Sequence, residues 1–199
     1  MFYAMRERFE GFSIKIGLLF SKFPLTPNQW TILSVVPVLA SFYYLVQEEF
    51  LPAALFFILA GFLDVVDGAV ARVTGRVTKL GAYLDTITDR FIEGILILGL
   101  FFVSLPSYIL DIKVLLFIYF FGAMMTTYVK AAAKEKELST KEIKGGLLER
   151  AERLSLLFIG LLLASQNVLY LTYIIFALAV LSNFTMLQRI WIAVKTAKK

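Results

Sequence analysis

The sequence predicts an all-α, polytopic membrane protein with six transmembrane helices and an N-terminal amphipathic helix lying in the membrane interface. Apolar residues make up 59% of the 199 residues, and the mean hydropathy is +0.79. A soluble domain of this size cannot bury so much apolar surface. Six apolar stretches are long enough to cross a hydrocarbon core, which takes about 20 helical residues. Lys and Arg collect in the segments on one side of these stretches.

The first twenty or so residues have the pattern of a helix lying in the membrane surface. Its apolar positions recur at helical spacing and are Phe9, Phe12, Ile16, Leu19, Phe20 and Phe23. Arg6, Arg8 and Lys15 fall elsewhere on the helical wheel, as in interfacial helices. A mobile N-terminus is the alternative. Because Glu7 and Glu10 interrupt any apolar run, we expect no signal peptide.

The apolar stretches divide the chain into short turns and longer charged segments. We place the spans at residues 28–46, 52–73, 81–104, 112–133, 147–165 and 168–192. Eighteen of the twenty Lys and Arg lie on one side of the spans: before the first span, in the segments after the second and the fourth, toward the C-terminus, or within the span ends that border these segments. By the positive-inside rule, this predicts a multi-pass cell-membrane protein with both termini and the two longer loops in the cytoplasm. We expect one domain over residues 1–199, with a solvated linker over 134–144.

Cysteine and histidine are both absent from the chain. Their absence removes disulfides, thiol nucleophiles, zinc and haem sites and histidine-based proton transfer from consideration. Carboxylates are left as the main candidates for acid–base chemistry and for binding metal ions.

Four aspartates lie within the apolar stretches, in the segment DVVDGAVARVTGRVTKLGAYLDTITD: Asp64, Asp67, Asp85 and Asp89. A carboxylate at the centre of a spanning helix costs roughly 2.5 to 3.5 kcal/mol, so we expect all four to face a wet cavity rather than lipid. The first two fall at i and i+3 and the last two at i and i+4, so each pair shares a helical face. The short loop between the two helices predicts antiparallel neighbours, whose carboxylates meet in a cavity open to the cytosol.

The residues around the aspartates favour a metal-bound diphosphate as the ligand. Neighbouring carboxylates repel one another unless protons or cations intervene, and an all-oxygen cluster suits Mg²⁺, Mn²⁺ or Ca²⁺. Gly68 and Gly81 leave room for a ligand, and Arg72 offers a planar fork for phosphate oxygens. Close helix packing explains the two glycines equally well, and a positive-inside position explains Arg72 taken alone.

A cation channel or transporter is the remote alternative, because intramembrane carboxylates also line ion pathways. Such a protein would spread its acidic residues along a route through the membrane. The four aspartates instead concentrate toward one face, alongside Arg72. We expect no nucleic-acid partner.

The segment over residues 64–89 matches DxxDGxxAR, eight further residues, and then GxxxDxxxD, with no departure at a defined position. It resembles the signature of the CDP-alcohol phosphotransferase (phosphatidyltransferase) family. The resemblance implies an enzyme that transfers a phosphatidyl-type group from a CDP-linked lipid to an alcohol and releases CMP. It also implies a single membrane domain with six spans, membrane lipid around it, and a homodimer.

The resemblance also implies roles for individual residues. Asp64, Asp67 and Asp85 would be ligands of two Mg²⁺ ions, with Mn²⁺ as a possible substitute. Asp89 would bind the second ion and accept the proton of the alcohol. The CDP-lipid site would comprise Gly68, Ala71, Arg72, Thr78, Gly81, Asn28 and Thr31. The last two belong to TPNQWT at 26–31, which resembles a TPNxxT segment of the family, and a plain helix start capped by Thr26 explains that segment as well.

The acceptor alcohol is suggested by two later segments, GLLERAERLSLL at 146–157 and FTMLQRI at 184–190. They resemble the family members that use inositol phosphate, which are bacterial phosphatidylinositol phosphate synthases and archaeal archaetidylinositol phosphate synthases. The resemblance implies a pocket for the acceptor's phosphate formed by Lys130, Arg150, Arg153 and Arg189. Three or more cations facing one cavity suit a dianionic phosphomonoester better than a neutral alcohol.

Several alternatives stay open for the acceptor pocket. Glu149 can pair with Arg153 at i and i+4, and Arg189 can extend toward the membrane surface. The long segment before Arg153 leaves Lys134 as a rival to Lys130. Glycerol phosphate is the alternative acceptor, since it carries the same phosphate. The donor is CDP-diacylglycerol or CDP-archaeol, and the archaeal resemblance favours the latter.

Overall fold

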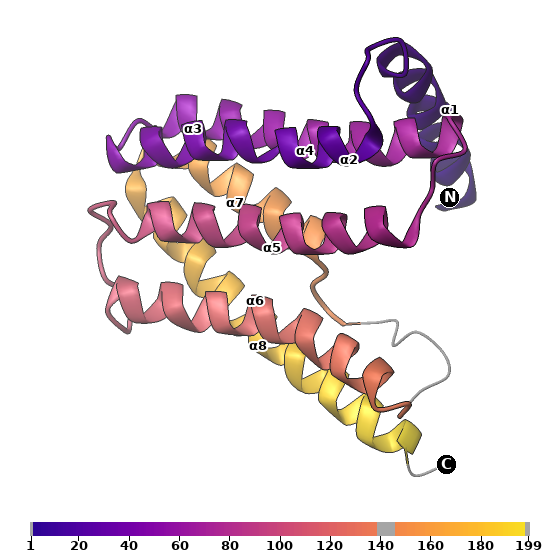
Figure 1. The fold of residues 1–199 in the computed structure, drawn as a ribbon. Coiled ribbons are helices and arrows are strands. Elements are labelled where there is room, and N and C mark those ends of the chain that lie inside the picture. Colours follow the sequence, from indigo (N-terminus) through magenta and orange to yellow (C-terminus); the bar gives the residue numbers. More distant parts are fainter. Residues whose placement is uncertain (1, 139–145, 198–199) are drawn as a thin grey trace. The chain divides into compact units, whose positions relative to one another are not determined.

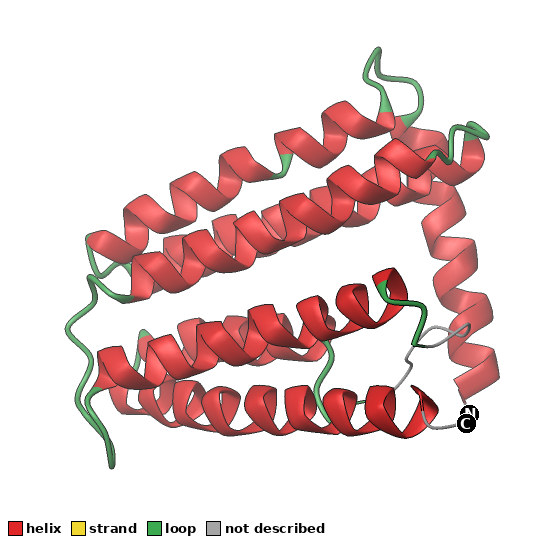
Figure 2. Cartoon of the chain, turned by 60° about the horizontal axis from the view of Figure 1, so that its bottom comes forward, coloured by secondary structure: helices red, strands yellow, loops and turns green. Residues whose placement is uncertain are grey.

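The computed structural model describes residues 2–138 and 146–197, and within these ranges it is all-helical with no strand (Figure 2). The all-α class is therefore confirmed. The helices are α1 (Phe2–Phe20), α2 (Pro27–Leu33), α3 (Val35–Val46), α4 (Phe50–Val73), α5 (Lys79–Leu100), α6 (Ile112–Glu135), α7 (Arg150–Ala164) and α8 (Val168–Ala197). Most of the linker predicted over 134–144 lies outside the described residues.

Four stretches of the described chain are long and apolar enough to cross a membrane: Pro27–Val46, Phe50–Val73, Ile112–Glu135 and Val168–Ala197. The protein is thus a multi-pass membrane protein. The other two predicted spans coincide with α5 and α7. α5 carries five charged residues, and α7 is only 15 residues long, short of the roughly 20 that a straight crossing takes. The count of six spans stays a prediction.

The first predicted span consists of two helices, α2 and α3, separated by a turn at Ser34. Proline explains the interruption, because Pro37 has no N–H to donate to the carbonyl of Leu33 and its ring crowds that carbonyl. At the turn itself, the Ser34 hydroxyl donates to the Thr31 carbonyl at 2.6 Å. α2 is also capped at its start, where Thr26 and Gln29 form a reciprocal capping box behind Pro27. The predicted helix start at TPNQWT is confirmed.

The described chain groups into two compact units, each considered by itself. The first contains residues 1–44 and 52–96, and the second contains residues 45–51 and 97–199. The first unit thus holds α1, α2 and most of α3, α4 and α5, whereas the second holds α6, α7 and α8. The single domain expected from the sequence stays a prediction.

In the first unit, α1 packs against α4. Ile16 lies in a buried apolar cluster with Trp30 of α2 and with Val66, Ala69 and Val70 of α4. Gly17 is needed at the crossing, because a Cβ there would lie 2.6 Å from the carbonyl oxygen of Ala69. Other apolar residues of α1, among them Phe12 and Leu19, are exposed. The helix predicted at the N-terminus is present; its place in the membrane interface stays a prediction.

In the second unit, α8 packs along both α6 and α7 (Figure 1). Gly122 of α6 makes room for Asn183 of α8, whose side-chain amide donates to the carbonyls of Ile118 and Ala179, each at 2.8 Å. At a turn of the same unit, the Glu48 carboxylate accepts the Ser104 N–H at 2.8 Å. This hydrogen bond keeps the pKa of Glu48 below its ordinary value.

Candidate active site

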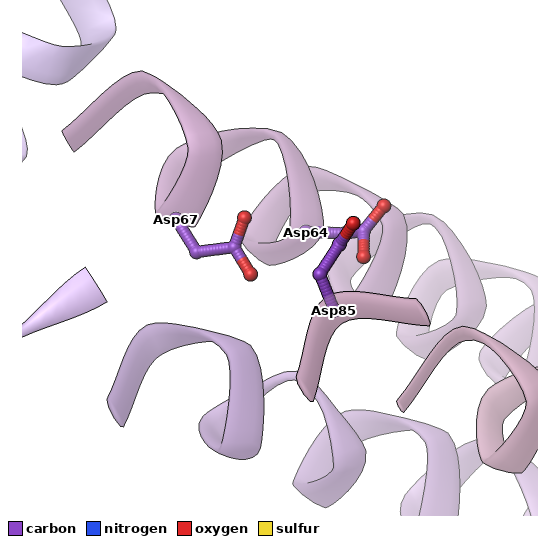
Figure 3. A group of neighbouring side chains, drawn as sticks. All are labelled: Asp64, Asp67 and Asp85. Atoms are coloured by element: carbon purple, nitrogen blue, oxygen red, sulfur yellow. The ribbon is translucent and has the colours of Figure 1, made fainter. Parts of the chain in front are cut away.

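Three of the four aspartates form a compact cluster in the first unit. α4 and α5 run antiparallel on either side of the loop over 74–78 (Figure 1). Asp64 and Asp67 project from α4 toward Asp85 of α5, and one oxygen from each carboxylate lies within 4.8 Å of the others. Figure 3 shows the three side chains turned toward one another. Asp67 is the most buried of them, with 5% of its surface exposed.

This carboxylate triad (Asp64, Asp67 and Asp85) fits a divalent cation. The Oδ2 atom of Asp67 is buried and has no hydrogen-bond partner among the described residues. A buried carboxylate oxygen of this kind normally has a donor or a cation beside it. Three carboxylates so close together also repel one another when ionised. A hard cation such as Mg²⁺ or Mn²⁺, which prefers carboxylate oxygens, would remove both costs.

A cavity of about 570 Å³ opens beside the triad, entirely within the first unit. All seven residues assigned to the CDP-lipid site line it: Gly68, Ala71, Arg72, Thr78, Gly81, Asn28 and Thr31. The Gly81 N–H donates to the Thr78 hydroxyl at 2.9 Å, and a Cβ on Gly81 would lie 3.1 Å from Oδ1 of Asn28. A side chain at position 81 would therefore crowd both neighbours and narrow the cavity.

Arg72 lies along one wall of this cavity. Its Nη1 atom is 3.2 Å from the point where a Cβ of Gly68 would stand, so the missing side chain makes room for the guanidinium. Its Nη2 donates to the hydroxyl of Ser13, on α1, at 2.7 Å. A guanidinium next to a carboxylate triad suits a ligand that brings both metal ions and phosphate oxygens.

Asp89 stands apart from the triad. It lies one turn after Asp85 on α5, its side chain is 15% exposed, and it does not line the cavity. Its carboxylate is 3.7 Å from Nη2 of Arg90, and Nη1 of the same arginine is 3.3 Å from the fully buried Glu93. Asp89 is thus followed by an ion pair on the same helix, with its acidic partner fully buried.

The predicted acceptor cations all lie in the second unit, on three different helices. Arg153, in the first turn of α7, is 1% exposed, and Arg189 of α8 is 8% exposed. The Nη1 atom of Arg189 donates to the Thr126 carbonyl of α6 at 2.9 Å, so this side chain is held inside the protein rather than extended toward the membrane surface. Lys130 and Arg150 are half-buried. Arg153 and Arg189 are thus two buried cations in one helical bundle. Burying a cation costs free energy unless anions or dipoles lie beside it.

A model of the CDP-alcohol phosphatidyltransferase family matches residues 24–190. The chain belongs to this family. It is therefore an enzyme that transfers phosphatidyl-type groups, as the sequence predicted. The matched region includes the carboxylate triad, the cavity and the cations of the second unit.

Similar proteins share nearly the whole length of this phosphatidyltransferase. An archaetidylinositol phosphate synthase of Pyrococcus horikoshii is 32% identical over 91% of this chain and 90% of its own. A phosphatidylinositol phosphate synthase of Corynebacterium glutamicum is 32% identical over 91% and 83%. The crystal structure of Mycobacterium tuberculosis phosphatidylinositol phosphate synthase with CDP-DAG bound matches with a TM-score of 0.79 and 26% identity, over 91% and 92%. The same enzyme in complex with manganese and citrate matches at 0.80 and 25%, over 94% and 89%.

The structure of this phosphatidyltransferase adds residues that sequence reasoning missed. Arg76 lines the same cavity, and Ser13 contacts Arg72 from a helix 59 positions earlier in the chain. No local sequence pattern predicts a contact between such distant residues.

The Arg90–Glu93 ion pair could have been predicted from the sequence, because two opposite charges at i and i+3 within a predicted span favour an ion pair.

A second missed feature is the segment before α7, which lies against α8 beside Arg189. The N–H of Leu148 donates to the Thr185 hydroxyl and the N–H of Leu147 to the Gln188 side chain, both at 3.0 Å. Gly146 has φ +139°, and a Cβ there would lie 2.5 Å from Cγ2 of Thr185 and 3.5 Å from Nε of Arg189. Only glycine satisfies both the backbone angle and the space at this position.

Replacing Gly146 with Ala is expected to raise the KM for a phosphorylated acceptor roughly tenfold. An alanine at this φ angle is strained by about 1–3 kcal/mol. The segment before α7 would relieve this strain by moving away from Arg189. Steady-state CMP release at varied acceptor concentration measures the effect. Gly61→Ala is the matched control, since a Cβ on Gly61 meets nothing within 4 Å. Equal acceptor KM values for the two variants would contradict the prediction that Arg189 and the segment beside it belong to the acceptor pocket.

Proposed function

We propose that this phosphatidyltransferase moves a phosphatidyl or archaetidyl group from a CDP-linked lipid to a phosphorylated polyol, most favourably inositol phosphate, and releases CMP. The observation that carries the proposal is the single cavity that holds the carboxylate triad together with every residue assigned to the CDP-lipid site. The similarity to inositol-phosphate-linked synthases at 32% identity supports the acceptor class.

The cavity volume suits the polar half of the donor. About 570 Å³ is within the range of small-molecule sites, roughly 300–1,000 Å³, and is large enough for a nucleoside diphosphate but not for two lipid chains. The chains of the donor would then lie against the apolar outer surface of the helices. The donor is CDP-archaeol or CDP-diacylglycerol, and CDP-DAG is the ligand bound in the mycobacterial structure.

The residues of the first unit would divide the work of the reaction. Asp64, Asp67 and Asp85 hold two Mg²⁺ or Mn²⁺ ions, which when bound offset the diphosphate charge and stabilise the leaving CMP. Arg72 donates to phosphate oxygens, and Gly68 leaves space for that contact. Asp89 completes the second metal site and accepts the proton of the attacking hydroxyl. The acceptor oxygen attacks the lipid-linked phosphorus directly, so no covalent enzyme intermediate forms.

The cations of the second unit would recognise the acceptor through its phosphate. Arg153 and Arg189 are buried, and a dianionic phosphate would accept charge-assisted hydrogen bonds from both. Lys130 and Arg150 would complete the pocket. A neutral alcohol offers no such charged acceptor oxygens, which favours a phosphorylated acceptor over a free polyol.

The proposal also includes how the chain crosses the membrane. α5 and α7 would complete six spans, with the charged side chains of α5 directed at the reaction site. Both termini and the cavity opening would face the cytoplasm, following the Lys and Arg distribution. α1 would lie in the membrane interface, with Phe12 and Leu19 exposed toward lipid. A homodimer is proposed on the family resemblance.

The decisive assay is CMP release by the purified enzyme with Mg²⁺, in which each donor is combined with inositol phosphate, glycerol phosphate or free inositol. We expect turnover with inositol phosphate and little with free inositol. Turnover with glycerol phosphate alone would make that compound the acceptor. Ion flux through reconstituted vesicles without CMP release would instead favour the channel alternative.

Replacing Arg189 with Gln is expected to raise the KM for inositol phosphate by roughly tenfold or more, because a hydrogen bond to a charged group is worth about 1.5–3 kcal/mol. The KM for the CDP-lipid should stay unchanged. Lys195→Gln is the matched control, since it removes a cation from the same helix that lies over the Trp191 ring. An equal change in both KM values would show that Arg189 supports the fold rather than the acceptor.

A further inference from the structure

Three residues of α1 form a continuous contact with the wall of the cavity. Ser13, Ile16 and Gly17 fall at i, i+3 and i+4, so they share one face of the helix. Ile16 is 7% exposed and belongs to the buried cluster with α4. A Cβ at Gly17 would lie 2.6 Å from the Ala69 carbonyl oxygen and 2.8 Å from Cγ1 of Val73. α1 therefore meets α4 at backbone distance, which places Ser13 close to the next turn of α4.

Ser13 uses this position to contact Arg72. Its hydroxyl oxygen accepts a hydrogen bond from Nη2 of Arg72 at 2.7 Å, while Nη1 lies over the Cα of Gly68. The guanidinium is thus held between a hydroxyl on one helix and a glycine on the other. Without such a contact, an exposed arginine samples many rotamers, and fixing them costs up to about 2 kcal/mol.

We propose that Ser13 is a positioning residue for the donor site: it holds the Arg72 guanidinium in the orientation that meets the diphosphate of the CDP-linked lipid. The inference rests on the proposed role of Arg72. Ser13 occupies one of the five N–H donors of the guanidinium, and the others stay available to phosphate oxygens. Ser13 itself does not touch the substrate. α1 thereby becomes a structural part of the donor site as well as a surface helix.

Replacing Ser13 with Ala tests the proposal, because the change removes only the hydroxyl. We expect the KM for the CDP-linked lipid to rise roughly fivefold, with kcat and the KM for inositol phosphate unchanged, as befits the loss of one hydrogen bond that orients a charged group. Ser13→Thr keeps a hydroxyl and should retain a donor KM near that of the wild type. Ser21→Ala is the matched control, since that hydroxyl on the same segment donates to the Leu18 carbonyl.

Ser13→Asp distinguishes a positioning role of Ser13 from a purely structural one. A carboxylate at this position would pair with Arg72 and compete with the diphosphate for it. The donor KM should then rise more than in Ser13→Ala, and added salt should reduce the difference between the two variants because it screens an exposed ion pair. A donor KM for Ser13→Asp equal to that of Ser13→Ala at low salt would count against the proposal.

A double-mutant cycle with Arg72→Gln separates this inference from the proposed function. Arg72→Gln alone should raise the donor KM by roughly tenfold or more, and adding Ser13→Ala should then change it no further. A fivefold effect of Ser13→Ala in both backgrounds would overturn the positioning role while leaving Arg72 at the donor site. An unchanged donor KM in Arg72→Gln would overturn the role of Arg72 and the inference with it. Thermal unfolding of each variant identifies any loss of fold, in which case Ser13→Thr and Ser13→Asp decide.

Discussion

Replacing Asp85 with Asn is expected to lower CMP release on the order of 10³-fold at saturating substrates, as removal of a group that stabilises transition-state charge commonly does. The amide has nearly the same shape as the carboxylate but no charge, so the triad loses one of the negative charges that would hold the metal ions, with little change in packing. Asp67→Asn should behave alike, because its Oδ2 is buried without a hydrogen-bond partner among the described residues. The measurement is CMP release at varied Mg²⁺.

Asp111→Asn is the matched control for this experiment. Asp111 caps α6 by accepting the Lys113 N–H at 2.9 Å, and Asn is an equally good N-cap, so this variant should be fully active. Chelation of divalent cations should abolish wild-type activity, and Mn²⁺ should restore it. If Asp85→Asn retained most of its activity, the triad could not be the metal site.

Asp89→Asn is expected to lower CMP release by roughly 10²- to 10⁴-fold, the range typical for loss of a general acid or base. Because Asp89 lies outside the compact triad, the two proposed roles can be separated. The variant should need a higher Mg²⁺ concentration to bind the CDP-linked lipid, yet saturating Mg²⁺ should not restore turnover. Stabilisation against thermal unfolding by donor and Mg²⁺ reports on binding, and single-turnover CMP release reports on chemistry.

Two other outcomes would revise the role of Asp89. Full recovery of turnover at high Mg²⁺ would make Asp89 a metal ligand only. Unchanged turnover would remove it from the reaction altogether. Asp111→Asn serves again as the control, since it makes the same substitution away from the first unit.

The meeting of the three aspartates could be predicted from the sequence because these residues are close together along the chain. Asp64 and Asp67 share a helical face by spacing alone, and a loop of a few residues brings Asp85 opposite them. Fixed spacing within two helices leaves little freedom in three dimensions. Gly68 and Arg72, assigned to the ligand by their chemistry and by the family resemblance, also line the cavity, and their contact with the ligand stays a prediction.

Features that depend on the meeting of distant segments could not be predicted in this way. The Ser13–Arg72 hydrogen bond joins helices 59 residues apart, and the space at Gly146 is limited by Thr185. Neither residue has a distinctive local pattern. The turn at Ser34 was within reach of sequence reasoning, because Pro37 removes a helical hydrogen bond four residues earlier. A hydropathy profile does not reveal this turn, because the residues on both sides of it are apolar.

That turn separates two demands on one stretch of chain. α2 carries Asn28 and Thr31 beside the triad, and its own capping box fixes where it begins. α3 continues as an apolar helix that packs against α4: the buried Ser41 hydroxyl donates to the Ala53 carbonyl at 2.8 Å, and the Tyr44 and Phe56 rings stack with their centroids 5.4 Å apart. The interrupted hydrogen-bond ladder therefore gives the two halves of one apolar stretch different partners. α2 lines the substrate cavity, and α3 anchors the same stretch to the apolar side of α4.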